Sequence, residues 1–316
     1  MKTKYLAYAA AAALFAAGCD NAQQAGLPLN GAGASFPDPV YQAWTYIYSQ
    51  AKNTTVNYQS IGSGAGINQI KGGTVDFAGT DAPLSAEEIK QSGLTQFPMV
   101  TGAVTPIVNI PGVQTGQLKL SDDVLAKIFM GQIKKWDDAA ITALNPGLKL
   151  PAQDILVVYR SDSSGTTNIF TEYLTDKSPD WATKIGAGKS VKWPTGLGGQ
   201  KNPGVCNNVQ QNSGSIGYTE YTYAIESKLT TVQLQAADGS WQNPGSKAWP
   251  LVGTTYLLVR DDIPADKKAA LQAYVDWCFS GDAAAKATEL HYTPLTKEQA
   301  RQSRFFLGAL KDEFVK

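Results

Sequence analysis

The stretch Gly31-Ala32-Gly33-Ala34-Ser35-Phe36-Pro37 places glycines and a hydroxyl directly before a segment with helical spacing. Two further stretches repeat this arrangement, Ile61-Gly62-Ser63-Gly64-Ala65-Gly66 and Arg160-Ser161-Asp162-Ser163-Ser164-Gly165-Thr166-Thr167. Small residues leave backbone N–H groups open to a ligand, and the start of a helix carries partial positive charge that favours an anion. Three such stretches in one chain predict a pocket for a small tetrahedral oxyanion.

These stretches also carry the polar groups that an anion needs when it is bound out of water. Desolvating the charge of an anion is expensive unless its oxygens are hydrogen-bonded. Arg160 adds a planar guanidinium that matches two oxygens, and Asp162 could hold that guanidinium in place. The other expected donors are the hydroxyl or N–H groups of Ser35, Phe36, Ser63, Ser164, Gly165 and Thr166.

Asp81, which directly follows Thr80, indicates which oxyanion the pocket selects. A carboxylate repels an anion unless the anion carries a proton that it can donate. Hydrogen phosphate carries such a proton at neutral pH and sulfate does not, so an ionised carboxylate there favours phosphate. Each feature alone is common in turns and helix caps, and only their joint occurrence predicts a site. Another tetrahedral oxyanion, sulfate or molybdate, stays open as an alternative.

Enzyme motifs are incomplete in this chain, so we expect a binding protein and not an enzyme. The stretch 62–66 is not a dinucleotide fingerprint, because Ile67 replaces its third glycine. No serine lies in a G-x-S-x-G elbow, and the single histidine, His291, is far in sequence from the three glycine-hydroxyl stretches. Scarce histidine and cysteine argue against a transition-metal site, and no cofactor is expected. A secreted phosphate-ester hydrolase is the enzymatic alternative, and the lack of a metal-binding constellation argues against it.

The N-terminus predicts export from the cytoplasm and a lipid anchor. Lys2 and Lys4 precede an apolar run at 5–17, which is too short to span a bilayer comfortably. The run ends in Ala16-Ala17-Gly18-Cys19, which resembles the lipobox of bacterial lipoproteins. We therefore expect a signal peptide at 1–18, lipidation of Cys19, and a lipidated N-terminus with a flexible tether at 19–30. The alternative is an ordinary secretory signal with an incidental cysteine.

Composition limits the remaining possibilities. Lysine and arginine balance aspartate and glutamate, 27 against 27, without a long run of either sign. Nucleic-acid binding would need a basic patch, so we do not expect it. The other two cysteines, Cys206 and Cys278, could pair in an oxidising compartment. Cys278 lies in an apolar helical run, however, which favours a buried free thiol.

Short apolar strands alternate with helical runs, which is the pattern of an α/β protein. Strands are expected at 56–60, 75–77, 104–110, 155–159, 215–218 and 254–259. Helices are expected at 37–50 with Ser35 as cap, from 67 onward, and at 122–129, 167–174, 267–279, 283–290 and 297–314. The section 184–250 has weak periodicity and predicts long loops with small strands. We expect the tryptophans of this section, and the one just before it, to pack within the protein and not to bind sugar: Trp181, Trp193, Trp241 and Trp249.

From about residue 31 to residue 292 the chain resembles the phosphate-binding proteins of bacterial high-affinity phosphate ABC transporters. The resemblance rests on motifs in matching order: residues 31–37, 56–64, 75–77, 80–83, 134–137, 193–194, 196–199 and 216–218. It implies a two-lobed periplasmic-binding-protein fold of type II, with the ligand cleft between lobes joined by strands that cross near 103–105 and 251–253. Lobe one would comprise 31–103 plus 252–316, and lobe two 104–251.

The same resemblance implies a function and a set of contacts. The family's ligand contacts carry over onto Ser35, Phe36, Ser63, Asp81, Arg160, Asp162, Ser164, Gly165 and Thr166. Ser35 stands where many relatives have threonine, and Ser163 stands where glycine is usual. The implied protein is a monomer that binds inorganic phosphate, closes by hinge motion and delivers the ligand to the membrane permease of an ABC importer. It would be held by lipid in the cell envelope, in the periplasm or at the outer face of the cytoplasmic membrane.

Overall fold

A ten-stranded sheet runs through the molecule, with its main strands in the order β2-β1-β3-β12-β4-β8-β6-β7. The structure is a computed structural model, and it describes residues 26–308. The main strands are β1 (Leu29–Gly33), β2 (Val56–Ser60), β3 (Phe77–Thr80), β4 (Leu94–Asn109), β6 (Leu156–Arg160), β7 (Leu197–Gly199), β8 (Ser215–Glu220) and β12 (Val252–Arg260). Short strands β9 (Thr230–Thr231) and β13 (Thr293–Pro294) pair with β4. A separate small sheet contains β5 (Lys119–Leu120), β10 (Gln233–Gln235) and β11 (Trp241–Gln242).

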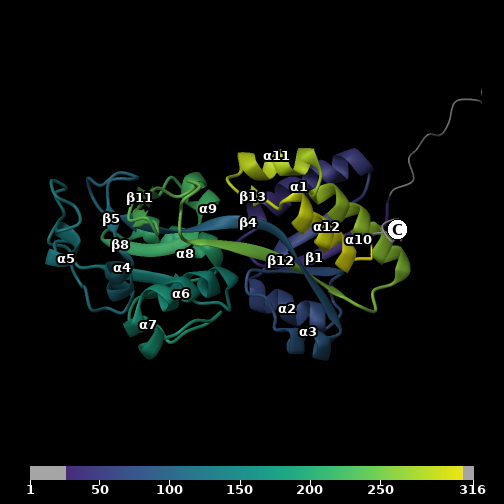
Figure 1. Cartoon of the computed structure of the whole chain (residues 1–316), viewed down its shortest axis with the longest axis horizontal. Coiled ribbons are helices and arrows are strands. Elements are labelled where there is room, and N and C mark those ends of the chain that lie inside the picture. The colour runs from purple at the N-terminus through teal and green to yellow at the C-terminus, as the bar shows by residue number, and fades with distance from the viewer. Residues whose placement is uncertain (1–25, 309–316) are drawn as a thin grey trace, which may run out of the picture.

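The helices divide between two halves of the molecule (Figure 1). In the first half, β1 to β3 are covered by α1 (Asp38–Lys52), α2 (Ser63–Lys71), α3 (Ala86–Ser92), α10 (Ala265–Cys278), α11 (Gly281–Glu289) and α12 (Lys297–Phe306). The second half holds β5 to β11 with α4 (Asp122–Phe129), α5 (Ala139–Thr142), α6 (Gly165–Lys177), α7 (Pro179–Lys184), α8 (Lys201–Gln211) and α9 (Tyr221–Glu226).

Two strands connect the halves. β4 pairs with β12 from Leu94 to Ala103 and then with β8 from Val104 to Asn109. The strand is apolar and buried along most of its length, so it forms part of the core in both halves. Its register against β12 shifts beside Pro98, which lacks the N–H of a regular ladder. The ladder between β4 and β12 places the two crossing strands side by side, and β12 pairs with β3 on its other edge.

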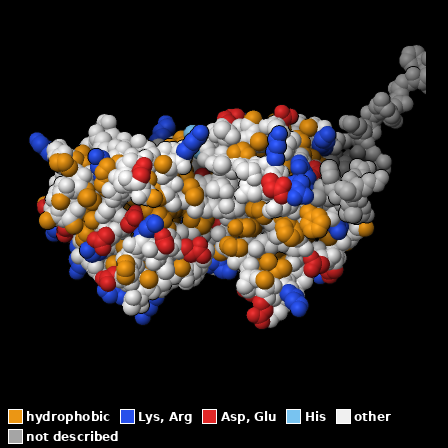
Figure 2. Space-filling view, in the orientation of Figure 1, with side chains coloured by type: hydrophobic (Ala, Val, Ile, Leu, Met, Phe, Trp, Pro, Cys, Tyr) orange, Lys and Arg blue, Asp and Glu red, His pale blue; other side chains and the backbone are white. Residues whose placement is uncertain are grey.

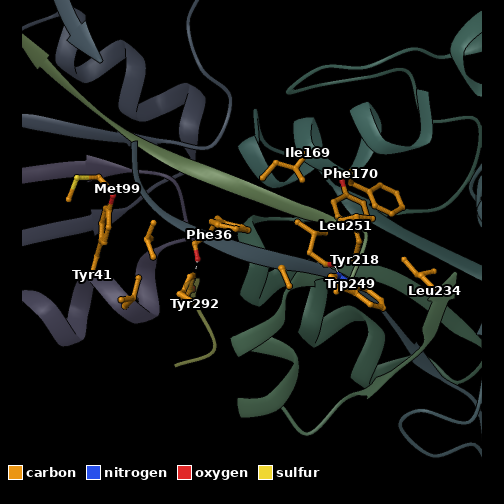
Figure 3. Close-up of a cluster of buried hydrophobic side chains, with 14 of the residues drawn as sticks. Phe36, Tyr41, Met99, Ile169, Phe170, Tyr218, Leu234, Trp249, Leu251 and Tyr292 are labelled. Atoms are coloured by element: carbon orange, nitrogen blue, oxygen red, sulfur yellow. Dashed lines mark hydrogen bonds between the residues drawn. The ribbon is translucent and has the colours of Figure 1, made fainter. Parts of the chain in front are cut away.

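Aromatic side chains fill the core of each half. Phe36 packs edge-on against Tyr292 in the first half, and Phe170 stacks on Tyr218 in the second with ring centroids 4.3 Å apart (Figure 3). Trp249 is buried and donates from Nε1 to the Val104 carbonyl at 2.9 Å, next to the crossing strands.

The four tryptophans serve packing, as the sequence predicts. Trp181 and Trp249 are buried, and the half-buried Trp193 stacks on Tyr159. The half-buried Trp241 lies beside the Lys119 ammonium, 5.7 Å from the ring centroid. Each ring therefore contacts the protein's own side chains.

The predicted strand at 56–60 and helix at 122–129 are confirmed to the residue. The prediction for Ser35 as a helix cap is wrong: Pro37 precedes α1 and no side chain caps it. The helix expected from 67 begins at Ser63, and Gly66 in its first turns lies against β1, where a Cβ atom would come within 2.5 Å of Gly33 Cα. The strand expected at 75–77 lies at 77–80, and that at 104–110 is the second part of a strand that begins at 94.

The remaining predicted elements differ mainly at their ends. The helix expected at 167–174 is longer at both ends, and the helix expected at 297–314 ends at Phe306 within the described residues. The section 184–250 contains helices α8 and α9, which the sequence reading missed. The cause is the abundance of asparagine, glutamine and glycine in α8, residues with weak hydrophobic periodicity.

Cys206 and Cys278 are both buried free thiols in different apolar clusters, as favoured from the sequence. The predicted signal peptide and Cys19 lie outside the described residues, and the predicted tether is described only from residue 26, with β1 beginning at Leu29. Within 26–308, no helix is long and apolar enough to cross a membrane. The same residues contain no group of His, Cys, Asp and Glu placed to hold a metal ion.

Candidate anion-binding site

The three glycine-hydroxyl stretches meet between the two halves. Ser35 follows β1, Ser63 follows β2 and Asp81 follows β3, while Arg160 ends β6 in the second half. Because β1, β2 and β3 run parallel, these residues come from the same edge of the sheet. The ends of the strands thus bring all three stretches and Asp81 to one place.

Almost every residue in the predicted contact set is buried. Arg160 is 4% exposed and Asp81 is 2% exposed, while Asp162 is half-buried. The other predicted contacts are buried as well: Ser35, Phe36, Ser63, Ser164, Gly165 and Thr166. An arginine and an aspartate this deep in a protein require charge partners, which is typical of a functional site.

Asp162 holds the guanidinium of Arg160, as expected from the sequence. Arg160 Nε donates to Asp162 Oδ1 at 2.8 Å, and Nη2 donates to Oδ2 at 2.7 Å. Burial opposes the ionised carboxylate, but the hydrogen bonds and charge of Arg160 outweigh it and lower the pKa of Asp162. This two-point contact fixes the plane of the guanidinium.

Asp81 is held by hydroxyls. Thr255 Oγ1 donates to Asp81 Oδ1 at 2.8 Å, and Ser63 Oγ lies 3.4 Å from Oδ2. Burial raises the pKa of Asp81 from 3.8 to about 7, although Thr255, the charge of Arg160 and Ser63 all act in the opposite direction. Asp81 can therefore accept or hold a proton near neutral pH.

The second and third stretches touch each other across the halves. Gly165 N donates to Ser63 Oγ at 3.0 Å, and Gly64 N donates to the Ser163 carbonyl at 3.0 Å. A Cβ atom at position 165 would lie 2.5 Å from Asp81 Oδ2 and 2.6 Å from Ser63 Oγ. Only glycine allows α6 to approach the first half this closely.

Tyrosine hydroxyls fix the loop that carries Ser35 and Phe36. Tyr223 donates to the Ser35 carbonyl and Tyr292 donates to the Phe36 carbonyl, both at 2.7 Å. The Ser164 hydroxyl accepts from Thr167 N at 3.1 Å and caps α6, which leaves its hydrogen free to donate.

Cavities approach this cluster from outside. One of about 320 Å³ is lined by Asp81 from the first half and by Ile169 and Glu172 from the second. Another of about 440 Å³ is lined by Asp162 and Lys189. Figure 2 shows a notch between the halves on the lower edge of the molecule. The cluster is thus an interior site between two bodies, with solvent close by.

Sequence reasoning missed two residues of the cluster. Thr255, in the crossing strand β12, bonds to Asp81 from a segment far away in the chain. Asn202, the second residue of α8, is fully buried and contacts Ser35 and Arg160. The paired glycines at 198 and 199 before α8 were the available signal for Asn202, whereas nothing local marks Thr255.

Two α/β halves with a buried polar cluster between them define a two-lobed binding protein of the periplasmic type. A family model described as "PBP superfamily domain" matches residues 18–282. The chain is 42% identical over 310 residues to the phosphate-binding protein PstS of Xylella fastidiosa strain 9a5c, covering 89% of this chain and 85% of the relative. It is 43% identical over 297 residues to PstS of Haemophilus influenzae, with 84% and 88% covered. The chain belongs to the family of the phosphate-binding protein PstS.

Solved structures share the fold at much lower sequence identity. A high affinity periplasmic phosphate-binding protein (PfluDING) bound with phosphate superposes with a TM-score of 0.73 at 20% identity, covering 88% of this chain and 93% of that chain. A phosphate-binding protein from Stenotrophomonas maltophilia gives a TM-score of 0.72 at 20% identity, with the same coverage of 88% and 93%. These likenesses confirm the expected α/β periplasmic-binding-protein fold.

Proposed function

We propose that this protein binds hydrogen phosphate outside the cytoplasm and delivers it to the permease of an ABC importer. The observation that carries the proposal is a buried carboxylate, Asp81, among hydrogen-bond donors on helix starts and one held arginine. Membership in the PstS family supports it, because the relatives are named phosphate-binding proteins. The protein acts in this proposal as a monomeric binding protein and not as an enzyme.

The proposed contacts are those expected from the sequence. Ser35, Ser63, Ser164 and Thr166 supply hydroxyls, and Phe36, Gly165 and Thr166 supply backbone N–H groups. The Gly165 N–H would exchange its bond to Ser63 Oγ for one to the anion. Arg160 supplies charge, Asp162 orients it, and Asp81 accepts the proton of the ligand. Supporting this assignment, Arg160 arrives with its orientation already set by Asp162, so ordering it on binding costs little entropy.

The proposal includes a hinge. Lobe one comprises 31–103 plus 252–316 and lobe two comprises 104–251, with the hinge where β4 changes partner from β12 to β8. Supporting this division, the ladder changes partner between Ala103 and Val104. Phosphate would bind to one lobe first and then draw the other over it, and the closed form would dock on the permease.

Titration calorimetry of the phosphate-stripped protein tests the function. Phosphate should bind with a stoichiometry of one, and sulfate and molybdate should bind more weakly at pH 8. Sulfate or molybdate binding as tightly as phosphate would transfer the assignment to another oxyanion. Absence of heat and of any thermal stabilisation with all three anions would reject an oxyanion-binding role.

We also propose that Cys19 carries the lipid that holds the protein in the cell envelope. The boundary Ala16-Ala17-Gly18-Cys19 supports it. Wild type should fractionate with membranes, and Cys19→Ser should be released or remain unprocessed. Mass spectrometry of the mature wild-type protein decides the point, because an unlipidated N-terminus at another position would contradict the anchor.

A further inference from the structure

The start of α8 lies in the second half, yet its second residue touches Ser35 of the first half. Asn202 donates two hydrogen bonds to Ser35 Oγ, from its backbone N at 3.3 Å and from Nδ2 at 3.1 Å. We propose that Asn202 is a positioning residue of the anion site, which orients the hydroxyls of Ser35 and Thr166 and links the two halves when they close. This inference rests on the proposed function and adds a residue to the contacts carried over from the family.

The neighbours of Asn202 determine how its amide is oriented. Arg160 Nη1 lies 3.4 Å from Oδ1, and Thr219 Oγ1 lies 3.3 Å from the same atom. A guanidinium can only donate, so the amide atom that faces Arg160 must be the carbonyl oxygen. The amide nitrogen is therefore directed to Ser35 Oγ and to Thr166 Oγ1, which is 3.4 Å away.

This orientation decides what the two hydroxyls can do. A hydroxyl oxygen that accepts from an amide nitrogen keeps its single hydrogen for another partner. Ser35 and Thr166 are thereby left as donors, which is the role that an ionised oxygen of an anion requires. Asn202 is fully buried and uncharged, so it directs the two hydroxyl hydrogens without adding a charge to the site.

Lys201 holds the start of α8 in place. Its φ of +59° lies in the left-handed region, which is uncommon for a residue with a side chain. Its N–H donates to Asp162 Oδ1 at 2.9 Å, and its Nζ donates to the Ser60 carbonyl at 3.0 Å. The first contact joins α8 to the carboxylate that holds Arg160, and the second joins α8 to the opposite half. Asn202 is thus positioned by the carboxylate that also holds Arg160 and by the backbone of the opposite half.

The position of this contact has a kinetic consequence. Ser35 and Asn202 belong to opposite halves, so their hydrogen bonds form only when the halves meet. An interaction that forms after the anion has entered slows the departure of the anion and leaves its rate of entry unchanged. Asn202 should therefore act on the dissociation rate.

Stopped-flow measurement of phosphate binding to Asn202→Ala tests the inference, with Asn207→Ala as the matched control. Asn207 is an exposed asparagine of the same helix. We expect the dissociation rate of Asn202→Ala to rise about tenfold or more, with an association rate within about twofold of wild type. In a double-mutant cycle with Ser35→Ala, the combined loss should be smaller than the sum of the single losses.

Thermal unfolding in phosphate-free buffer shows whether the variants fold. If Asn202→Ala is unfolded, Asn202→Ser, which keeps a small polar side chain, is measured in the same way. A dissociation rate equal to that of Asn207→Ala, a change confined to the association rate, or an additive cycle would each overturn the role of Asn202. Wild-type protein that fails to bind phosphate would instead reject the proposed function itself.

Discussion

Arg160 and Asp162 form a pair that occurs a second time in the molecule without the surrounding site. Arg260 contacts Asp262 with the same spacing and the same two nitrogens, but that pair is on the surface. The two pairs have the same contacts and differ in their surroundings. Only the buried pair has the hydroxyl and N–H groups of three helix starts beside it.

Arg160→Ala should therefore weaken phosphate binding by about 2–5 kcal/mol, the cost of removing one partner of a buried charged contact. Arg260→Ala is the matched control and should leave affinity unchanged, because Arg260 pairs with Asp262 at the end of β12 and bonds to none of the proposed contact residues. Calorimetric titration of both variants measures the difference. Equal affinities would remove Arg160 from the proposed contacts.

Asp81 makes the stability of the phosphate-free protein depend on pH. Burial raises its pKa from 3.8 to about 7, so between these values the folded chain holds a proton that the unfolded chain has released. Its contribution to stability is full below about pH 4 and is lost as the pH rises through 7. We expect the free energy of unfolding in urea to fall between pH 5 and pH 8.

Asp81→Asn should flatten part of this decline. Glu220, also buried, has a pKa raised to about 8 by burial and acts in the same direction, so a residual slope should remain. A slope as steep in Asp81→Asn as in wild type would show that Asp81 is not protonated in the folded state.

Much of the candidate cluster could be predicted because its residues lie next to each other in the sequence. Ser164, Gly165 and Thr166 follow one another, and each has a recognisable role at a helix start. Asn202 and Thr255 were missed because their contacts with Ser35 and Asp81 span 167 and 174 residues of the chain. Such contacts depend on how the strands are ordered, which no local pattern contains.

Among the elements, α6 and β12 touch across the halves. A Cβ atom on Gly253 would lie 2.2 Å from Ile169 Cδ1 and 2.6 Å from Ile169 Cγ1. The glycine lets α6, which begins with Gly165, lie directly on the crossing strand. Gly253 pairs with Gly102 of the other crossing strand, so neither strand carries a side chain at this point.

Gly253→Ala should push α6 away from β12 and weaken phosphate binding, with a cost of about 1–3 kcal/mol for the extra methyl group. Gly281→Ala is the control, since a Cβ atom there would meet nothing within 4 Å. Phosphate affinity and thermal unfolding of both variants are compared. Wild-type affinity in Gly253→Ala would show that this contact does not support the closed arrangement.

Elements with strong local signals were predicted well, and those that depend on tertiary pairing were not. The helix at 122–129 has a serine cap, acidic residues in its first turn and an apolar face, so its sequence is sufficient. β4 extends ten residues further toward the N-terminus than the predicted start at 104 because β12 provides a partner there. Helix α8 has polar residues in most positions and is held by contacts with the rest of the second half.

Direct hydrogen bonds join the two halves of the protein around the site. They connect Gly165 with Ser63, Gly64 with Ser163, and Lys201 with Ser60. A ligand that binds groups from both halves favours the arrangement in which the halves meet. The anion and these contacts should therefore stabilise the same closed form.

Small-angle X-ray scattering should show a smaller radius of gyration with phosphate than in phosphate-free buffer. Arg160→Ala at the same phosphate concentration should stay close to the phosphate-free value. An unchanged radius in wild type at saturating phosphate would contradict closure by hinge motion.

In the proposed function the buried carboxylate of Asp81 selects a protonated anion, and the ratio of the sulfate and phosphate dissociation constants measures this selection. At pH 8, above the Asp81 pKa of about 7, wild type should bind phosphate at least about tenfold more tightly than sulfate, since an ionised acceptor without a donor is costly. Asp81→Asn should bind phosphate only moderately more weakly, and its ratio should fall toward one. A wild type that binds both anions equally, or a ratio that the substitution leaves unaltered, would contradict selection by Asp81.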